Sequence, residues 1–436
     1  MTCVLLFSIR IHWETSPIFA LKGMNFVKAI FERISKMSLI VKILIGLAAG
    51  TVLGLLLPQF TFISMLGTLF VGALKGIAPV LVFFIIVSSL SQGTQAHGGV
   101  IRTVILLYAF STVVAAINAV FAIKLFPIQM VLTDTVSASV DTAPAGIMEV
   151  LSNMAGTIVQ NPVQAIGSGN YLGILFWAVL IGIVFKKIAK PSTAEFLENT
   201  ADCLSKVVGM IIQFAPLGIL GLSYSNVIDG GLSSFATYGK LVAILIAVML
   251  FQFFVVNAII VFWCTRKNPY PLIFYCLRKS AVTAFFTRSS AANIPVNMEA
   301  ASEMGLDKDT YSVTIPLGSA VNMDGAAITI TIMTLATCNT LGIHVDLASA
   351  ILLSLLASVS AAGASGIAGG SLLLIPLACS LFGIPDTISA QVIGVGFIIG
   401  VIQDSMETAL NSSSDLLLTA SAEFREWRRE GKKIPF

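Results

Sequence analysis

The sequence contains little charge and few of the residues that build soluble catalytic or metal sites. Of its 436 residues, 11% are charged and 56% are hydrophobic, whereas a soluble chain carries about a quarter charged residues. Its three histidines and six scattered cysteines show no metal-ligand spacing, and no GxxxxGK[ST] nucleotide-binding loop is present. Zinc, triad and ATP-driven chemistry are therefore disfavoured, and the composition predicts a polytopic membrane protein that is not an enzyme.

One long stretch of the sequence lacks basic residues. No lysine or arginine occurs between Asp309 and Glu423. The acids that lie in or beside hydrophobic segments within this stretch are Asp324, Asp404, Glu407 and Asp415. A carboxylate at the centre of a bilayer costs about 2.5–3.5 kcal/mol even on a lenient insertion scale, so such residues indicate function. We expect external cations or protons to compensate them.

Hydrophobic runs and basic loops predict the topology. Six spans are predicted at about 38–57, 62–90, 101–126, 169–185, 205–225 and 239–264. Counted from a cytoplasmic N-terminus, every Lys/Arg-rich connection falls inside, and the basic-free connections after the third and fifth spans fall outside. The basic tail at 425–433 is expected to face lipid headgroups rather than nucleic acid. Because a basic amphipathic stretch follows Met24, we expect Met24 to be the native start.

Beyond residue 265 two apolar runs are interrupted. The run 271–298 is broken by TRSS at 287–290, and the run 345–383 is broken by a Gly/Ser-rich stretch. Irregular backbone cannot face lipid, because its N–H and C=O groups would lack partners. We therefore predict two re-entrant helical hairpins related by an inverted repeat, each followed by a full helix, 311–340 and 387–420.

The last of these helices carries an oxygen-rich face. Asp404, Thr408, Asn411 and Asp415 are spaced i, i+4, i+7 and i+11, which places them on one side of a helix. Glu407 lies at the margin of this face.

The helix after the first break contains the string NMDG at 322–325. Gly318, Asn322 and Asp324 there combine a backbone carbonyl, an amide oxygen and a carboxylate where Gly325 loosens the helix. Alone, NMDG is equally compatible with a helix-terminating turn. Beside the acidic face it favours a site for a hard alkali cation, since such cations take oxygen ligands.

Four motifs together resemble a known family. They are TRSS at 287–290, NMDG at 322–325, GASGIAGGS at 363–371 and the D…T..N…D pattern at 404–415. They resemble the dicarboxylate/amino acid:cation symporter family, and within it the bacterial sodium/serine-threonine branch. The resemblance runs over nearly the whole chain from about residue 35, with the predicted spans and hairpins in the same order.

The resemblance implies the all-α elevator fold of the glutamate-transporter homologues: eight transmembrane helices plus two re-entrant hairpins with inverted repeats, in a homotrimer of the bacterial inner membrane. The expected parts are a cytoplasmic segment 1–37, six spans in 38–264, a transport core 265–421 and a basic cytoplasmic tail 422–436. Spans one, two, four and five would form a fixed scaffold. Spans three and six would join the moving core.

The resemblance also implies a substrate site between the hairpin tips and the last two helices. Asp404 would receive the substrate ammonium, and Asn411 and Ser290, with hairpin-tip N–H groups, would hold its carboxylate. Thr408 would line the pocket. The other residues expected there are Arg288, Ser289, Ala326, Gly363, Ser371 and Glu407.

Sodium is the implied coupling ion. One implied Na⁺ site comprises Gly318, Asn322, Asn411 and Asp415. Another comprises Ser111, Thr112, Asn322 and Asp324. Backbone carbonyls at 361–364 would hold a further cation.

Departures from the acidic-substrate members indicate the substrate. Those members carry Arg where this chain has Glu407, and Thr where it has Ala326. An arginine would clamp a side-chain carboxylate in bidentate fashion, whereas Glu407 would repel it. We therefore expect L-serine and L-threonine, with Glu407 accepting a hydrogen bond from the substrate hydroxyl. The alternative is that Glu407 pairs with Arg288. Acidic-substrate members carry an Asp at the position of Gly400, so the arrangement of cations at this position stays open.

Rival functions remain at this point. A sodium- or proton-coupled carrier of another small amino acid or a dicarboxylate is the main alternative, and an ion channel is a remote one. An intramembrane aspartyl protease could pair Asp324 with Asp404, but Asn, Thr and broken helices surround these acids.

Overall fold

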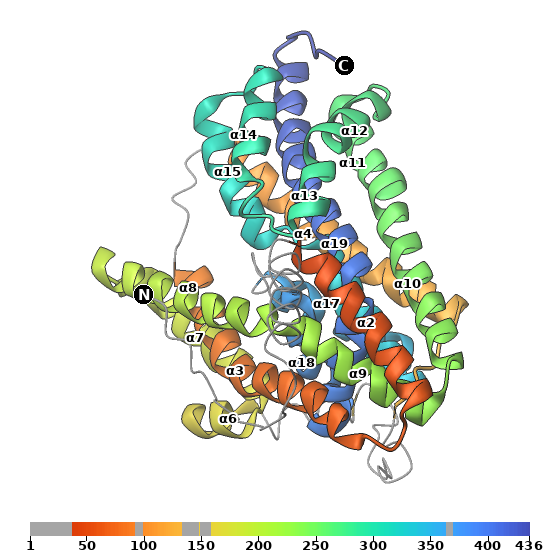
Figure 1. Ribbon diagram of the computed structural model, residues 1–436. Coiled ribbons are helices and arrows are strands. Elements are labelled where there is room, and N and C mark those ends of the chain that lie inside the picture. Colours follow the sequence, from red (N-terminus) through yellow and green to blue (C-terminus); the bar gives the residue numbers. More distant parts are fainter. Residues whose placement is uncertain (1–36, 92–98, 133–147, 149–157, 363–368) are drawn as a thin grey trace, which may run out of the picture.

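The computed structural model describes residues 37–91, 99–132, 148, 158–362 and 369–436. Within these residues the regular structure is helical and contains no β-strand (Figure 1). The question of Met24, most of the connection after the third predicted span, and part of the second hairpin lie outside the described residues.

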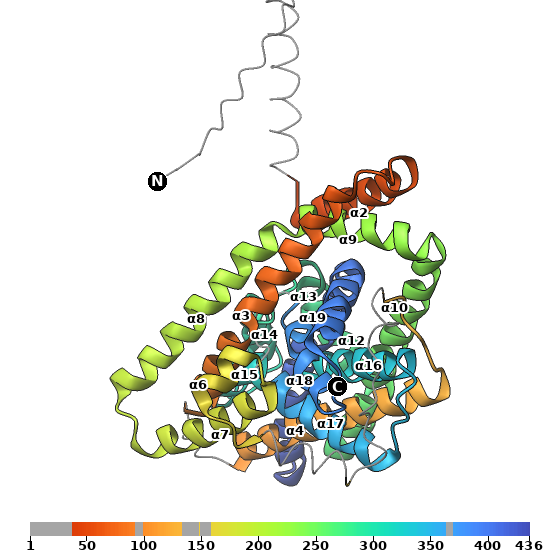
Figure 2. The same cartoon turned by 90° about the horizontal axis from the view of Figure 1, so that it is seen from below.

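One group of helices is formed by the first, second, fourth and fifth predicted spans. Its members are α2 (Leu39–Leu56), η1 (Thr61–Ile63), α3 (Ser64–Ser91), α6 (Pro162–Ser168), α7 (Tyr171–Ile188), α8 (Pro191–Gln213) and α9 (Ala215–Gly230). Helix α2 packs on α9, and α3 packs on α7, α8 and α9. Figure 2 shows α3 and α8 along one side of the molecule.

The second group contains the third and sixth predicted spans and everything after residue 265. Its members are α4 (Gly99–Leu125), α10 (Ser233–Phe251), η2 (Gln252–Val256), α11 (Asn257–Thr265), α12 (Tyr270–Cys276), η3 (Leu277–Ala281), α13 (Val282–Thr287), α14 (Ile294–Glu303), α15 (Lys308–Val321), α16 (Asp324–Thr340), α17 (Leu347–Ala361), η4 (Gly370–Leu374), α18 (Ile375–Ser380) and α19 (Asp386–Arg429). Helix α16 packs on α4, α17 and α19. Figure 2 shows α19 near the centre of the molecule.

Helix α16 lies at the centre of the second group. Fifteen of its 17 residues, Asp324 to Cys338, are buried. Helix α19 is 44 residues long and spans about 66 Å at 1.5 Å per residue, roughly twice the thickness of a hydrocarbon core. Its C-terminal part therefore extends well past the apolar region.

The two segments predicted as hairpins contain short helices in the described residues. Helices α12 to α13 and α14 lie in the first segment, and α17 and α18 lie in the second. The helix predicted at 311–340 is interrupted at Asn322 and Met323, whose backbone angles are not helical. The corresponding helix after the second hairpin, α19, is continuous. The two repeats thus differ where the NMDG string occurs.

The fifth predicted span is not one straight helix. Helices α8 and α9 meet at Phe214 with a bend of 56°. Pro216 in the first turn of α9 has no N–H with which to continue the α8 ladder, which accounts for the break. The polar α8 carries Glu195, Glu198 and Asp202, so its apolar half alone produced the predicted segment.

The described helices are compatible with a multi-pass membrane protein. Six of them are long and apolar enough to cross a bilayer, or seven if α8 and α9 are counted as one bent span, and α2 contributes a shorter apolar helix. The number of eight spans stays a prediction.

Candidate functional site

A hairpin tip and an acid of α19 meet in an ion pair. The Nε of Arg288 lies 2.5 Å from Oδ2 of Asp404, and the side chains are 11% and 3% exposed. Arg288 caps α13 in the left-handed region (φ 52°), a conformation that costs a non-glycine residue about 1–2 kcal/mol. At the second hairpin, the N–H of Gly369 donates to Oδ1 of Asp404 at 3.0 Å. Asp404 therefore binds both hairpins.

Glu407 lies one turn further along α19 and is 5% exposed. Three donors converge on its Oε2: the Thr329 hydroxyl at 2.8 Å, the Ser371 hydroxyl at 2.9 Å and Nε2 of Gln403 at 2.5 Å. No hydrogen bond among the described residues involves its Oε1. The alternative pairing of Glu407 with Arg288 is wrong in this structure, because the guanidinium is bound to Asp404 instead.

Helix α16 approaches α19 closely beside Glu407. A Cβ on Gly325 would lie 2.8 Å from the Cα of Glu407, so only glycine permits this approach. The N–H of Gly325 donates to Oδ1 of Asn411 at 2.7 Å. The glycine of the NMDG string therefore lies inside α16, after the non-helical Asn322 and Met323, and permits the contact between the two helices.

The residues predicted for the first sodium site lie together. Nδ2 of Asn322 donates to Oδ1 of Asp415 at 2.9 Å and lies 3.4 Å from the backbone oxygen of Asn411. A Cβ on Gly318 would lie 2.8 Å from Oδ1 of Asp415. Two buried oxygens there, Oδ1 of Asn322 and Oδ2 of Asp415, have no hydrogen-bond donor among the described residues.

The donor chemistry of this cluster fits an alkali cation. Hard cations take carboxylate, amide and carbonyl oxygens, and an unpaired buried acceptor costs about 1–3 kcal/mol that a bound cation would offset. In the described part of the chain, no group of three or more His, Cys, Asp or Glu residues is arranged to hold a metal ion. The cluster therefore fits Na⁺ better than a transition metal.

The second predicted sodium site is assembled only in part. The Ser111 hydroxyl lies 2.6 Å from Oδ2 of Asp324, and the Thr112 hydroxyl lies 3.0 Å from Oδ1. Asn322 directs its amide to Asp415 rather than to this acid. Gln252, which the sequence reasoning missed, lies 3.4 Å from Oδ2 of Asp324.

Polar residues within apolar spans are the signal that would have found the missed partners. Gln252 and Asn257 interrupt the apolar sixth span, and both are fully buried beside Ser111. Tyr108, in the third span, donates to the backbone oxygen of Asp415 at 3.0 Å and pairs with Thr419 at 2.9 Å. Helix α4 is thus linked to Asp324 and, through Tyr108, to the backbone of Asp415.

The remaining predicted residues are placed as follows. Ser290 is buried at the tip of the first hairpin, and the Ser289 hydroxyl caps the N–H of Ala292 nearby. The Thr408 hydroxyl donates back to the carbonyl of Asp404, and Ala326 is fully buried on α16. Gly363 and the carbonyls of residues 363 and 364 lie outside the described residues.

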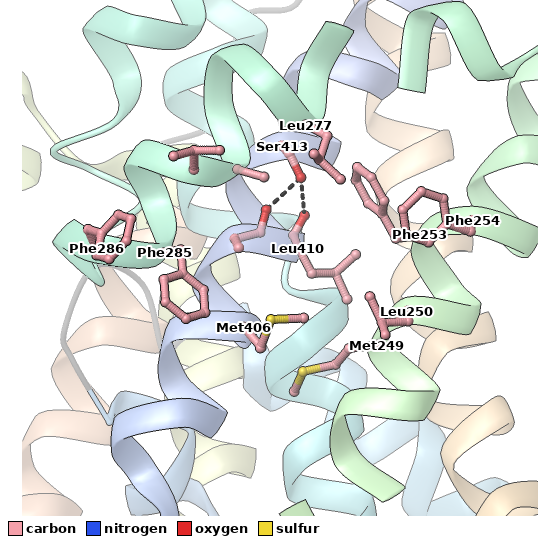
Figure 3. Close-up of a pocket in the computed structure, with 13 residues that line it drawn as sticks. Met249, Leu250, Phe253, Phe254, Leu277, Phe285, Phe286, Met406, Leu410 and Ser413 are labelled. Atoms are coloured by element: carbon pink, nitrogen blue, oxygen red, sulfur yellow. Dashed lines mark hydrogen bonds between the residues drawn. The ribbon is translucent and has the colours of Figure 1, made fainter. Parts of the chain in front are cut away.

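A neighbouring apolar pocket is distinct from these acids. Its volume is about 300 Å³, and Figure 3 shows it between α10–η2, the first hairpin and α19, lined by side chains such as Phe253, Phe285 and Met406. Its lining is apolar except for Ser413, whose hydroxyl bonds to the carbonyls of Ala409 and Leu410. Such walls offer no charge to orient an amino acid, so the acidic cluster is the better candidate site.

Comparison with known proteins decides the family. The profile of the Sodium:dicarboxylate symporter family matches residues 39–423, which is most of the chain. The chain belongs to this family. The resemblance inferred from the four motifs is therefore confirmed.

Curated relatives in this family are similar over nearly their whole length. The serine/threonine transporter SstT of Bifidobacterium adolescentis is 51% identical over 409 residues, covering 94% of this chain and 95% of the relative. The transporter of the same name from Enterococcus faecalis is 54% identical over 403 residues (92% and 95%). That of Streptococcus agalactiae is 53% identical over 388 residues (89% and 96%).

The residues of the acidic site on α16 and α19 lie within the part of the chain that matches the family. TRSS, NMDG and the face of α19 all fall inside the matched residues 39–423. The site combines two hairpins, α4, α16 and α19. No residue role follows from the family match alone, so the roles are argued separately below.

Proposed function

We propose that the protein is a secondary active symporter that carries L-serine and L-threonine together with Na⁺ across the bacterial inner membrane. The observation that carries the proposal is the set of buried carboxylates on α16 and α19. Among Asp324, Asp404, Glu407 and Asp415, only Asp404 has a basic partner within 4 Å in the described part of the chain. The similarity to transporters named for serine and threonine supports the choice of substrates.

Sodium coupling rests on Asp415 and Asn322. Both are fully buried, and each has an oxygen without a donor in the described structure. An isolated carboxylate in such a place is strongly disfavoured unless an ion pairs with it or a proton neutralises it. A Na⁺ ion held by Asp415, Asn322 and the carbonyls of Gly318 and Asn411 would satisfy these oxygens, and we assign the ion there. A second Na⁺ at Asp324, Ser111 and Thr112 is proposed on the same chemistry.

Substrate selection rests on Glu407. Its Oε2 is saturated by three donors, which holds the carboxylate in one orientation, while Oε1 has no partner in the described residues. We assign Oε1 as the acceptor for the hydroxyl of serine or threonine. The negative charge of Glu407 repels a side-chain carboxylate, so aspartate, glutamate and succinate are poor substrates in this proposal.

Asp404 is proposed to bind the substrate ammonium. In this structure its two oxygens already accept from Arg288 and Gly369. A carboxylate has about four acceptor positions, so an ammonium can join these donors or replace the guanidinium. The substrate carboxylate would then bind Asn411, Ser290 and hairpin-tip N–H groups, because half-helix ends present free N–H groups to anions.

The two packing groups suggest the moving parts. We propose that α2, α3, α7, α8 and α9 form the scaffold and that α4, α10, α11 and the residues from 265 to 421 form the transport domain of an elevator in a homotrimer. The support is that each group packs mainly within itself. One net charge moving across about 100 mV supplies about 2.3 kcal/mol, enough for roughly fiftyfold accumulation before the sodium gradient is added.

Radiolabelled serine flux into proteoliposomes tests the proposal. An inward Na⁺ gradient should drive concentrative serine uptake, and an equal choline gradient should not. Unlabelled threonine should compete, whereas aspartate and succinate should not. Equal uptake in sodium and choline, or strong competition by a dicarboxylate, would overturn the coupling ion or the substrate class respectively. Single-channel currents would point to the remote channel alternative.

A further inference from the structure

A second pocket, away from the acidic site, lies between the ends of three helices. Its volume is about 410 Å³, and its walls come from α4, α11 and the last turns of α19. Its lining has two distinct parts. One part is apolar and the other is a group of arginines.

The polar part contains four arginines. They are Arg266, Arg425, Arg428 and Arg429. Arg429 lies 3.1 Å from Glu426, but no ion pair of the other three occurs among the described residues. Four arginines thus line one small volume whose lining includes no acidic residue. A group of positive charges attracts anions, and planar guanidinium groups match phosphate oxygens well.

The apolar part is exposed. Leu106, Phe110 and Trp263 are 60%, 52% and 65% exposed. Side chains of this size would not line a water-filled phosphate site, but they suit the hydrocarbon just below the headgroups. Trp263 lies two residues before the end of α11, where tryptophan commonly marks the membrane interface.

The pocket lies at cytoplasmic depth. The basic-loop rule places the ends of α11 and α19 inside, where Arg266 and the basic tail follow them. Arg266 itself adopts a left-handed conformation (φ 58°) as the cap of α11. The chain therefore turns at this arginine, immediately above the apolar wall.

We propose that this pocket binds one anionic phospholipid of the cytoplasmic leaflet. The arginines bind the headgroup phosphate, and the first part of an acyl chain lies along Leu106, Phe110 and Trp263. A free phosphate would use the arginines alone and would leave the apolar wall unoccupied. Basic pockets between transmembrane helices on the cytoplasmic side are a recognised form of lipid site.

Quenching of Trp263 by brominated lipid tests the proposal directly. The chain has four tryptophans, so Trp13→Phe, Trp177→Phe and Trp427→Phe together leave Trp263 as the single reporter. The full-length protein is reconstituted in phosphatidylcholine vesicles with increasing dibrominated phosphatidylglycerol or dibrominated phosphatidylcholine. The proposal expects phosphatidylglycerol to quench Trp263 at a lower mole fraction, which gives a relative binding constant well above one.

Charge variants identify the headgroup contacts. Because Arg428 is exposed, the Arg428→Gln variant should fold normally. It should lower the relative binding constant for phosphatidylglycerol about fivefold, since each basic residue near the membrane surface contributes about this factor. Arg266→Gln should lower the constant to the same extent. The matched control Lys186→Gln with Lys187→Gln removes two positive charges at the cytoplasmic end of α7 and should leave the constant unchanged.

Two outcomes would overturn the proposal. Equal quenching by the two brominated lipids would show that Trp263 meets bulk lipid only. An equal loss in the α7 control and in Arg428→Gln would show that general surface charge attracts the lipid. As a further arm, soluble glycerol phosphate should not displace the quenching lipid; displacement would assign the pocket to a free phosphate instead.

Discussion

The interface of α2 with α9 and that of α16 with α19 both bring two backbones close together at glycine, but only the second also places buried acids and amides between its helices. In the first, Gly46 and Gly50 bring two backbones together, so that an added Cβ would lie 2.2 and 2.1 Å from the carbonyl oxygens of Pro216 and Leu220. In the second, carboxylates, amides and hydroxyls bond across the helices.

The difference indicates what each interface is for. Backbone contact through glycine depends only on shape and has no titratable or ion-binding group. The α16–α19 contact leaves acceptor oxygens without donors, which is costly unless something else binds there. A permanent interface has no reason to keep such oxygens, whereas a transport site does. The following experiments test this contrast.

The largest effect is expected for Asp415→Asn. Removing the only charge among the ligands of the proposed first sodium site should weaken sodium binding by roughly 100-fold or more and abolish sodium-dependent serine uptake. The measurement is serine binding to purified protein with and without sodium. Asp386→Asn, a half-exposed acid on the same helix, is the matched control and should behave as wild type. Sodium coupling that survives in Asp415→Asn would contradict the proposed site.

The next effect is on stability. Gly50→Ala should destabilise the protein by about 1–3 kcal/mol, because its Cβ would overlap the carbonyl of Leu220 and the helices would have to separate. Gly72→Ala is the control, since a Cβ there meets no atom within 4 Å. Thermal inactivation in detergent compares the two. Similar melting of both variants would show that the close α2–α9 contact is not important for stability.

A smaller effect is expected for Glu407→Gln. Losing a charged acceptor for the substrate hydroxyl should reduce the preference for serine over alanine about tenfold. It should also relieve the repulsion of aspartate. Competition for serine uptake by alanine and by aspartate measures both. An unchanged preference for serine would assign Glu407 to holding Thr329, Ser371 and Gln403 in place.

The smallest effect is at the surface. Lys279 donates to Glu303 at 2.8 Å, and this contact, with Tyr275, lowers the pKa of Glu303 from its ordinary value. A lowered pKa contributes stability that is present above the unfolded pKa and is lost as pH falls through the folded one. Lys279→Gln should therefore change stability little at pH 7 and make it less sensitive to acid. Melting curves from pH 7 down to pH 3 test this; a marked loss at pH 7 would contradict it.

Local pattern was sufficient for much of the architecture. The predicted spans at 101–126 and 239–264 agree with 99–125 and 233–265, because long apolar runs and basic flanks are local properties. The breaks of the hairpins were visible as polar or Gly/Ser-rich interruptions. The fifth span was described incompletely, since the bend at Phe214 depends on a proline within a continuous apolar stretch.

Contacts across the fold were not predictable in the same way. Arg288 and Asp404 are 116 positions apart, and the sequence reasoning offered Arg288 to Glu407 instead. It also treated all four acids as lacking an internal counter-charge, whereas Arg288 supplies one to Asp404. Thr329 was missed because nothing in its own sequence neighbourhood distinguishes it from the other threonines of α16, and only its contact with Glu407 does so.

The sequence by itself determined that this chain has several apolar segments able to cross a membrane, that two apolar runs are interrupted, and that one helix face is rich in oxygen. These follow from hydropathy, from the need to satisfy backbone groups and from the 3.6-residue period, all of which act over short distances. Only the tertiary structure decided which acid pairs with Arg288 and which oxygens at Asn322 and Asp415 are left without a donor. These contacts form only where segments far apart in the sequence meet in the fold, and a short-range sequence pattern does not determine which segments meet.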